Sequence, residues 1–311
     1  MWAPWLQGAY EQVQARLADD ALPHALLIHG PPGWGQLLLA DAIALQVIGR
    51  APDEPGLGPP AAELAHQDLR WIEPDGKSGQ TRIDLVRELG EFSQRRPQAA
   101  PRKVAVVTAA ESMNAAATNA LLKTLEEPPP DTYILLVTSA LGELLPTIRS
   151  RCMLLAVHPV TEAEALDWVR SQLPGPAPAD LEALSFELGA APLALLEVLG
   201  AEHEPVGPLL DTARSGRQTP AALANALANA DLEDLLRRWI RYVVDALQAR
   251  LTGGSPRLAS LAGLPAEDLL DCQDQLMHAL QLVQGTSNPN PRLLLETLLV
   301  RWRDLGRRHR R

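Results

Sequence analysis

Several features that would place this chain of 311 residues in particular protein classes are scarce or missing. Its two cysteines, Cys152 and Cys272, have no neighbours at metal-ligand spacing, so we expect reduced thiols, with no disulfide and no metal site. No stretch has the length and apolarity of a membrane span, and the N-terminus lacks the basic-then-apolar order of a signal peptide. These absences predict a cytoplasmic protein that does not contact a membrane.

Positive charge is also scarce. Lys and Arg together number 28 against 38 Asp and Glu, which gives a formal net charge of −10, and lysine occurs only at Lys77, Lys103 and Lys123. Proteins that coat nucleic acid need clustered Lys and Arg to displace counterions. The composition therefore excludes a whole-protein nucleic-acid coat, and any contact with DNA must be local.

A glycine-rich segment stands where a phosphate-binding loop would be expected, between an apolar strand at 25–28 and a predicted helix at 38–48. Its residues are Gly30, Gly33, Gly35, Gln36 and Leu37, within the sequence GPPGWGQL. In the pattern G-x-x-x-x-G-K-[ST], the lysine reaches the phosphates and the hydroxyl holds magnesium. Gln36 and Leu37 occupy those two positions, so this loop is predicted not to hydrolyse nucleotide. Glycines alone could equally mark an ordinary strand-to-helix turn.

A second apolar strand, at 104–107, runs into the place where a P-loop ATPase carries its acidic pair. Thr108 and Ala109 stand there instead. Glu111 lies beyond the strand end, and we interpret it as a solvated loop or helix-start acid. The residues that would bind magnesium are thus missing from both segments.

Two further segments are far more specific. NALLKTLEEPP, at 119–129, is an amphipathic helix ended by prolines, and LPTIRSRC, at 145–152, follows a third strand at 133–137. On these segments the chain resembles the clamp-loader subunits of bacterial DNA polymerase III, which belong to the AAA+ class. The resemblance covers essentially the whole chain, strongly to about Cys152. The opening sequence WAPWL, the altered loop and Thr108-Ala109 favour a non-catalytic member over its ATPase paralogues.

Strand and helix signals alternate as far as His158, which predicts a parallel sheet covered by helices. Thr161 to Glu164 is a plausible capped helix start, and three amphipathic helices are expected at 231–251, 265–284 and 291–305, the first with a face of Leu235, Ile240, Val244 and Leu247. The resemblance implies an AAA+ α/β domain at 1–160, a small helical lid at 161–201 and an all-α collar at 202–311. Periodicity alone cannot distinguish a collar that packs against other subunits from a self-contained bundle.

Two other family features are altered. The Gly-x-x-Arg by which the lid of the ATPase paralogues touches nucleotide corresponds to residues 189–192, where Pro192 replaces the arginine. Relatives also often carry a four-cysteine zinc module, whereas residues 51–66 are rich in Pro, Gly and Ala without cysteine and predict an irregular surface excursion. His66, at its end, is interpreted as a surface or capping histidine.

The resemblance assigns roles to four residues. It makes Arg151 an arginine finger, supplied in trans to the ATP site of a neighbouring subunit, and places Thr147 near the same site. In a different context Arg151 would simply cap a strand or pair with a local carboxylate. Arg87 and Lys123 match residues of the paralogues that contact DNA phosphates, although each could be an ordinary solvated residue.

The implied function is that of a non-catalytic clamp-loader subunit, without a cofactor of its own, in a complex whose other members bind ATP. Its partners would be the ATPase subunits gamma and tau, the delta subunit, the sliding clamp and primed DNA. Two alternatives stay open. One is an active ATPase in which Gln36 substitutes for lysine, and the other is a passive scaffold in which the collar does all the work.

Overall fold

A computed structural model describes residues 2–51, 60–74, 81, 83–178, 181–200, 206–228, 230–253, 261, 263–285 and 289–306. The chain divides into two compact units, Met1–Pro174 with Ala191–Leu196, and Gly175–Ala190 with Glu197–Arg311. The finer division into three domains at residues 160 and 201 stays a prediction.

The first unit is built on a five-stranded sheet in the order β2-β3-β4-β1-β5, with all neighbouring strands parallel. The strands are β1 (Ala25–His29), β2 (Leu69–Ile72), β3 (Lys103–Val107), β4 (Thr132–Thr138) and β5 (Met153–Ala156). The predicted parallel sheet is confirmed, and its three central strands are those that the sequence predicted. The two edge strands were not predicted: Arg70 interrupts the apolar run of β2, whereas β5 is a short apolar run whose side chains at 153, 154 and 156 are not fully buried.

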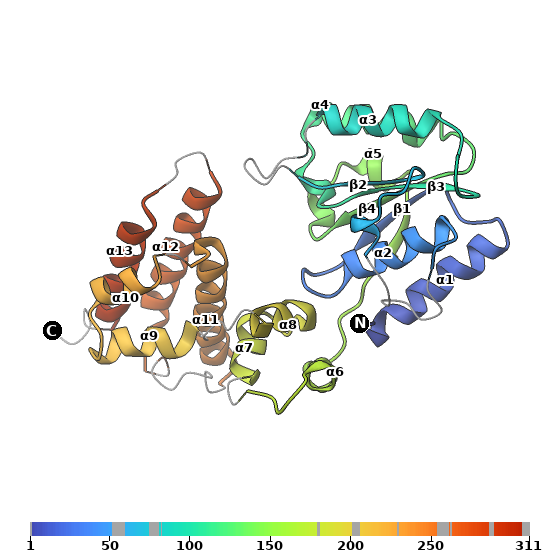
Figure 1. Cartoon of the computed structure of the whole chain (residues 1–311). Helices are drawn as coiled ribbons and strands as arrows, with labels where there is room; N and C mark the ends of the chain where they lie inside the picture. Colours follow the sequence, from blue (N-terminus) through green and yellow to red (C-terminus); the bar gives the residue numbers. More distant parts are fainter. Residues whose placement is uncertain are drawn as a thin grey trace. The chain divides into compact units, whose positions relative to one another are not determined.

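Helices cover both faces of the sheet, with α3 and α4 on one side and α1 and α2 on the other (Figure 1). Alternate strand residues, such as Leu27 and Ile134, pack against Leu89 and Leu121 of the first pair. The helices and 3-10 turns of this unit are η1 (Pro4–Leu6), α1 (Gln7–Ala18), α2 (Gln36–Val47), η2 (Ala61–Glu63), α3 (Ile83–Gln94), η3 (Ala110–Ser112), α4 (Ala115–Glu126), η4 (Leu141–Glu143), α5 (Pro146–Arg149) and α6 (Glu162–Gln172).

The helix ends follow their local sequence signals. The side chain of Asn114 accepts a hydrogen bond from the backbone of Ala117 at the start of α4, which ends at Glu126, just before the prolines. Thr161 and Glu164 form a reciprocal capping box at the start of α6, as the sequence predicted.

A buried ionic cluster joins the loop after α3 to the sheet. The carboxylate of Asp68 accepts hydrogen bonds from the backbone of residues 98, 99 and 100, and the ammonium group of Lys103 donates to the carbonyls of Phe92 and Arg95. Burial lowers the pKa of Lys103, against the opposing effect of Asp68. Lys103, one of the few lysines, is therefore used for structure and is not available to DNA.

The second unit is helical. It contains α7 (Leu181–Glu187), the second half of α8 (Pro192–Gly200), whose first half belongs to the first unit, and then α9 (Val206–Ser215), α10 (Pro220–Ala226), α11 (Leu232–Thr252), α12 (Ala266–Gln284) and α13 (Pro291–Asp304). Its core includes Trp239 and Trp302, whose rings meet edge to face at 5.5 Å, and the indole of Trp302 donates to the carbonyl of Leu210 at 3.1 Å. The three long predicted helices are confirmed as α11, α12 and α13.

The predicted face of α11 is only partly right. Leu235 is buried, but Ile240 and Leu247 are only partly buried, and Val244 does not belong to the core cluster. The apolar residues of α11 that are buried are Leu235, Leu236, Trp239, Tyr242, Val243, Ala246 and Ala249. A helix advances 3.6 residues per turn, so the stripe from Leu235 passes through 239 and 242 and leaves 244 at its margin.

Candidate functional site

In the glycine-rich loop, Gln36 stands where a P-loop has its lysine, and its side chain bonds to the loop itself. Gln36 is buried, and its side-chain amide donates hydrogen bonds to the carbonyls of Gly30 and Pro31. Gly33 and Gly35 have φ values of 77° and 100°, which favour glycine. The two glycines permit the tight turn between β1 and α2, and the neutral amide of Gln36 bridges carbonyl groups of the same turn.

The chain itself packs closely against this loop. A Cβ atom on Gly33 would lie 2.8 Å from the Cβ of Ala191 and 3.0 Å from that of Ala194, and the backbone N–H of Leu193 donates to the carbonyl of Gly33 at 3.1 Å. Trp34, inside the loop, is buried, and its carbonyl accepts from the indole of Trp5 at 2.9 Å. The start of α8, with Pro192 in place of the arginine, and the N-terminal aromatic residues thus pack against the loop.

Positions 108 and 109, where an ATPase would carry its acidic pair, are occupied by residues with structural roles. Thr108 is buried, and both its hydroxyl and its backbone N–H donate to the carbonyl of Ile72, at 3.2 Å and 2.9 Å. Glu111 lies in the first turn of η3, consistent with a helix-start acid, and accepts from the hydroxyl of Ser139 at 2.9 Å. The residues present do not fit a magnesium-nucleotide complex, because neither Thr108 nor Ala109 offers a carboxylate and Leu37 offers no hydroxyl.

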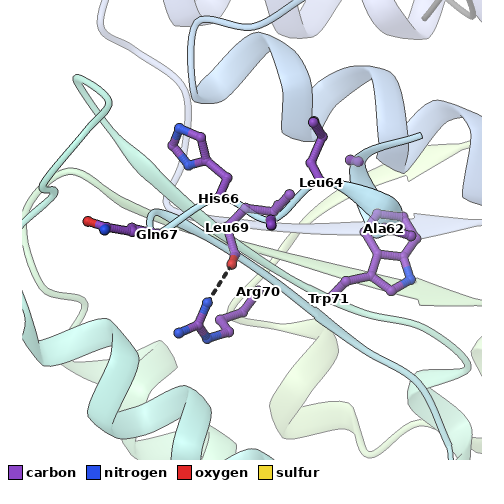
Figure 2. Close-up of a pocket in the computed structure, with 9 residues that line it drawn as sticks. Ala62, Leu64, His66, Gln67, Leu69, Arg70 and Trp71 are labelled. Carbon is purple, nitrogen blue, oxygen red and sulfur yellow. Dashed lines mark hydrogen bonds between the residues drawn. The ribbon is translucent and has the colours of Figure 1, made fainter. Parts of the chain in front are cut away.

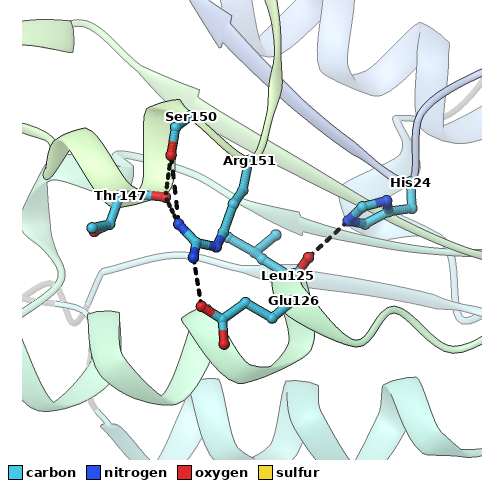
Figure 3. Close-up of polar contacts among 6 residues, drawn as sticks. All are labelled: His24, Leu125, Glu126, Thr147, Ser150 and Arg151. Carbon is cyan, nitrogen blue, oxygen red and sulfur yellow. Dashed lines mark hydrogen bonds and ion pairs between the residues drawn. The ribbon is translucent and has the colours of Figure 1, made fainter.

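Arg151 follows the short helix α5, and its side chain is held by three oxygen atoms (Figure 3). Its Nη2 donates to Oε1 of Glu126 at 2.7 Å, and its Nη1 donates to the carbonyl of Thr147 at 3.0 Å and lies 3.5 Å from the hydroxyl of Ser150. The side chain of Arg151 is 34% exposed and that of Glu126 is 51% exposed. A permanently charged fork is thus oriented at the surface and stays accessible to a partner.

The sequence did not single out Glu126 for a role, although it lies within the NALLKTLEEPP segment. It is 25 residues from Arg151 along the chain, and no local pattern links the two. Thr147 contributes its backbone carbonyl to this cluster. The assignment of Arg151 and Thr147 to a site shared with another subunit stays a prediction.

Cys152, the residue after Arg151, is partly buried. Burial raises the pKa of its thiol to about 11, and raises that of Cys272 in the second unit to about 12. Both thiols are protonated near neutral pH, so neither provides a thiolate for chemistry.

Arg87 and Lys123, the two residues proposed to contact DNA, line the same groove. Helices α3 and α4 lie side by side, and a groove of about 670 Å³ between them is bordered by Arg87 from α3 and Lys123 from α4. Other polar residues at its border are Glu91, Gln94, Asn119, Thr124 and Glu127. Arg87 also lies 3.6 Å from Asp84 in an exposed ion pair, an interaction too weak to fix its side chain. The sequence named two residues of this groove, while Gln94 and Asn119 became visible only in the folded chain.

A second hollow, of about 420 Å³, lies beside η2 and the edge strand β2 and is lined mainly by apolar side chains (Figure 2). Arg70 closes part of the strand edge by donating to the carbonyl of Leu69 at 3.0 Å. His66, predicted to be a surface or capping histidine, is partly buried and accepts a hydrogen bond from the backbone of Asp68 at 3.1 Å, just before β2. Residues 52–59 of the predicted excursion lie outside the described residues. Among the residues that the structure does describe, no group of three or more His, Cys, Asp or Glu is arranged to hold a metal ion.

Comparisons with known proteins place these features in a family context. A sequence model of the family described as DNA polymerase III, delta subunit, matches residues 5–161. The chain is 33% identical to DNA polymerase III subunit delta' of Pseudomonas aeruginosa, over 97% of each chain, and 30% identical to that of Yersinia pestis, over 97% of this chain and 95% of the other.

The fold is similar to a crystal structure of a gamma-subunit-related protein of DNA polymerase III from Thermotoga maritima. The TM-score is 0.59 at 21% identity, and the match covers 96% of this chain and 99% of the other. In the part of the chain that the structure describes, no helix combines the length and apolarity needed to cross a membrane.

Proposed function

We propose, because the chain belongs to the delta' family of DNA polymerase III subunits, that it is a non-catalytic component of the clamp loader acting in the cytoplasm during DNA replication. It has an AAA+ parallel-sheet domain followed by a helical region. In the proposed assembly it presents Arg151 to the ATP bound by a neighbouring gamma or tau subunit. The delta subunit, the sliding clamp and primed DNA complete the assembly.

One observation carries this proposal. Arg151 is oriented by an ion pair with Glu126, and its side chain is still one-third exposed. In the chain's own glycine-rich loop, by contrast, the side chain of Gln36 stands where a P-loop lysine would be. An arginine finger stabilises the charge that develops on the transferred phosphoryl group, and its planar fork suits two phosphate oxygens at once. Reconstitution of the assembly with an Arg151 substitution tests the proposal.

The alternative of an active ATPase finds no support in the loop. It requires Gln36 to act as the lysine, but this amide is hydrogen-bonded to the loop's own carbonyls and carries no charge. We therefore propose that the chain uses no nucleotide cofactor and has no ATPase activity of its own.

Restoring the two consensus residues should not restore nucleotide binding. We expect the double variant Gln36→Lys, Leu37→Thr to bind no more Mg-ATP than the unmodified chain, because Ala191, Ala194 and Trp34 still pack at the loop and position 108 still lacks a carboxylate. Isothermal titration of both proteins, with a clamp-loader ATPase subunit as the positive control, measures this. Micromolar affinity of the double variant alone would contradict this expectation, and magnesium-dependent turnover by the unmodified chain would reverse the conclusion that it has no ATPase activity.

We also propose that the groove between α3 and α4 contacts the phosphates of primed DNA inside the assembly. Arg87 and Lys123 face one groove from two helices, whereas the net charge of the whole chain is −10, so that any contact is local. Two phosphate contacts give a small, salt-sensitive contribution that only the assembled loader would make useful.

The salt dependence of DNA binding tests this groove. Each of Arg87→Ala and Lys123→Ala should lower the slope of log affinity against log salt by roughly 0.9, the value for one phosphate contact on duplex DNA. Fluorescence anisotropy of labelled primed DNA with the reconstituted loader gives the slopes. Arg96→Ala, an exposed arginine outside the groove, is the matched control and should leave the slope unchanged. Equal slopes for all four proteins would remove the groove from the DNA path.

A further inference from the structure

The guanidinium of Arg151 is held between two fixed points (Figure 3). One is the carboxylate of Glu126, the last residue of α4, and the other is the carbonyl of Thr147 in α5. The first lies 2.7 Å from Nη2 and the second 3.0 Å from Nη1, so the two terminal nitrogens are restrained separately. Together these contacts favour one direction of the side chain and one orientation of the guanidinium plane.

The end of α4 that carries Glu126 is itself anchored. Nε2 of His24 lies 3.0 Å from the carbonyl oxygen of Leu125, which can only accept, so the ring donates this hydrogen bond. The helix cannot continue past this point because Pro128 and Pro129 follow. The hydrogen bond from His24 and the prolines that end the helix therefore set the position of the Glu126 backbone, and its carboxylate reaches Arg151 from the end of a helix.

Enough donors remain on Arg151 for a ligand. Among the described residues its contacts with Glu126, Thr147 and Ser150 use at most three of the five N–H groups of the guanidinium. A phosphate oxygen could thus be bound without first breaking the contact with Glu126. An unrestrained arginine would lose considerable rotamer freedom on binding, and a side chain already oriented loses less.

We propose that Glu126 is a positioning residue that pre-orients Arg151 toward the phosphate of the neighbouring subunit. The inference rests on the proposed function, since it gives Glu126 no role unless Arg151 acts in trans. Glu126 itself touches no substrate and acts only through the guanidinium.

A double-mutant cycle in the reconstituted clamp loader tests the inference. The proteins are the unmodified chain, Glu126→Ala, Glu126→Gln, Arg151→Ala and the double variant Glu126→Ala, Arg151→Ala, each assayed for DNA- and clamp-stimulated ATP hydrolysis. Glu126→Ala should lower kcat at the one site that Arg151 serves about two- to fivefold, the range that an exposed ion pair contributes, with KM nearly unchanged, and total hydrolysis should fall by less than with Arg151→Ala. Glu126→Gln should recover part of the loss, because its amide oxygen still accepts from Nη2.

The decisive comparison is between Arg151→Ala and the double variant. These two should be equally impaired, because Glu126 has no effect once the guanidinium is gone. Glu63→Ala, an exposed glutamate beside the opposite edge of the sheet, should behave like the unmodified chain.

The outcomes separate the two proposals. If Arg151→Ala impairs hydrolysis but Glu126→Ala leaves it unchanged or raises it, or if the two losses simply multiply, the positioning role is wrong and the finger stands. If Arg151→Ala itself has no effect, the proposed function fails, and the role of Glu126 fails with it.

Discussion

A clamp loader that carries Arg151→Ala is expected to lose stimulated ATP hydrolysis at one of its sites. Where an arginine finger has been dissected, it contributes roughly 10³ to 10⁵ in rate, so this one site should fall nearly silent. Hydrolysis by the whole assembly should decline only in part, since in the proposed assembly other subunits serve the remaining sites. Clamp loading should decline more, if all the sites must act together.

The fold of the chain should survive the change. Arg151 contributes an exposed ion pair with Glu126, worth about 1 kcal/mol at most, and its removal leaves no buried charge behind. Co-purification with the other subunits and the thermal unfolding temperature of the isolated chain check that assembly and folding are intact.

Two companion variants sharpen the result. Arg151→Lys should restore activity only in part, because an ammonium group is a point charge without the bidentate fork. Arg149→Ala removes a neighbouring arginine, the last residue of α5, and should have little effect. If the Arg151→Ala assembly hydrolyses ATP and loads clamps at the unmodified rate, the passive scaffold becomes the better description of this subunit.

The second large effect is expected on the stability of the helical unit. Glu187 in α7 and Arg238 in α11 form a buried ion pair at 3.5 Å, with side chains 0% and 6% exposed. Glu187 also accepts backbone hydrogen bonds from Val206 and Gly207 at the start of α9, at 2.8 Å and 2.9 Å, so one carboxylate joins three helices. Arg238→Ala removes its cationic partner and should destabilise this unit by about 3–5 kcal/mol.

The loss of stability caused by Arg238→Ala should depend on pH. Burial already raises the pKa of Glu187, against the opposing effects of the two backbone donors and Arg238, and removal of Arg238 should raise it further. A carboxyl group with a raised pKa binds more protons in the folded state than in the unfolded state. Stability therefore falls as pH rises above the unfolded-state pKa, and the defect should be smaller near about pH 5 than near about pH 8.

Urea unfolding at the two pH values, with hydrogen exchange of peptides from α9 and α11, measures this defect. Arg237→Ala is the matched control, because the adjacent side chain is 58% exposed and pairs with Glu233 at the surface. It should cost no more than about 0.5 kcal/mol. A defect that is equal for the two arginines, or unaffected by pH, would show that the buried pair does not set the stability of this unit.

The sequence by itself determined the chemistry that this chain lacks. Gln36, Leu37 and Thr108 cannot supply a cation, a metal-binding hydroxyl or a carboxylate in the places where an ATPase needs them, whatever the fold. It also determined the helix ends, because capping residues and prolines act on the backbone within a few positions. The start of α6 at the Thr161 capping box is one such case.

Only the tertiary structure decided how distant residues combine. It brought Glu126 to Arg151, placed Arg87 and Lys123 on one groove, and set Ala191 against Gly33 of the loop. It also buried Lys103, which the sequence presents like any other lysine. Each of these pairings joins segments that are far apart in the chain. Which segments meet is decided by how the helices pack on the sheet, and local sequence patterns carry no information about that packing.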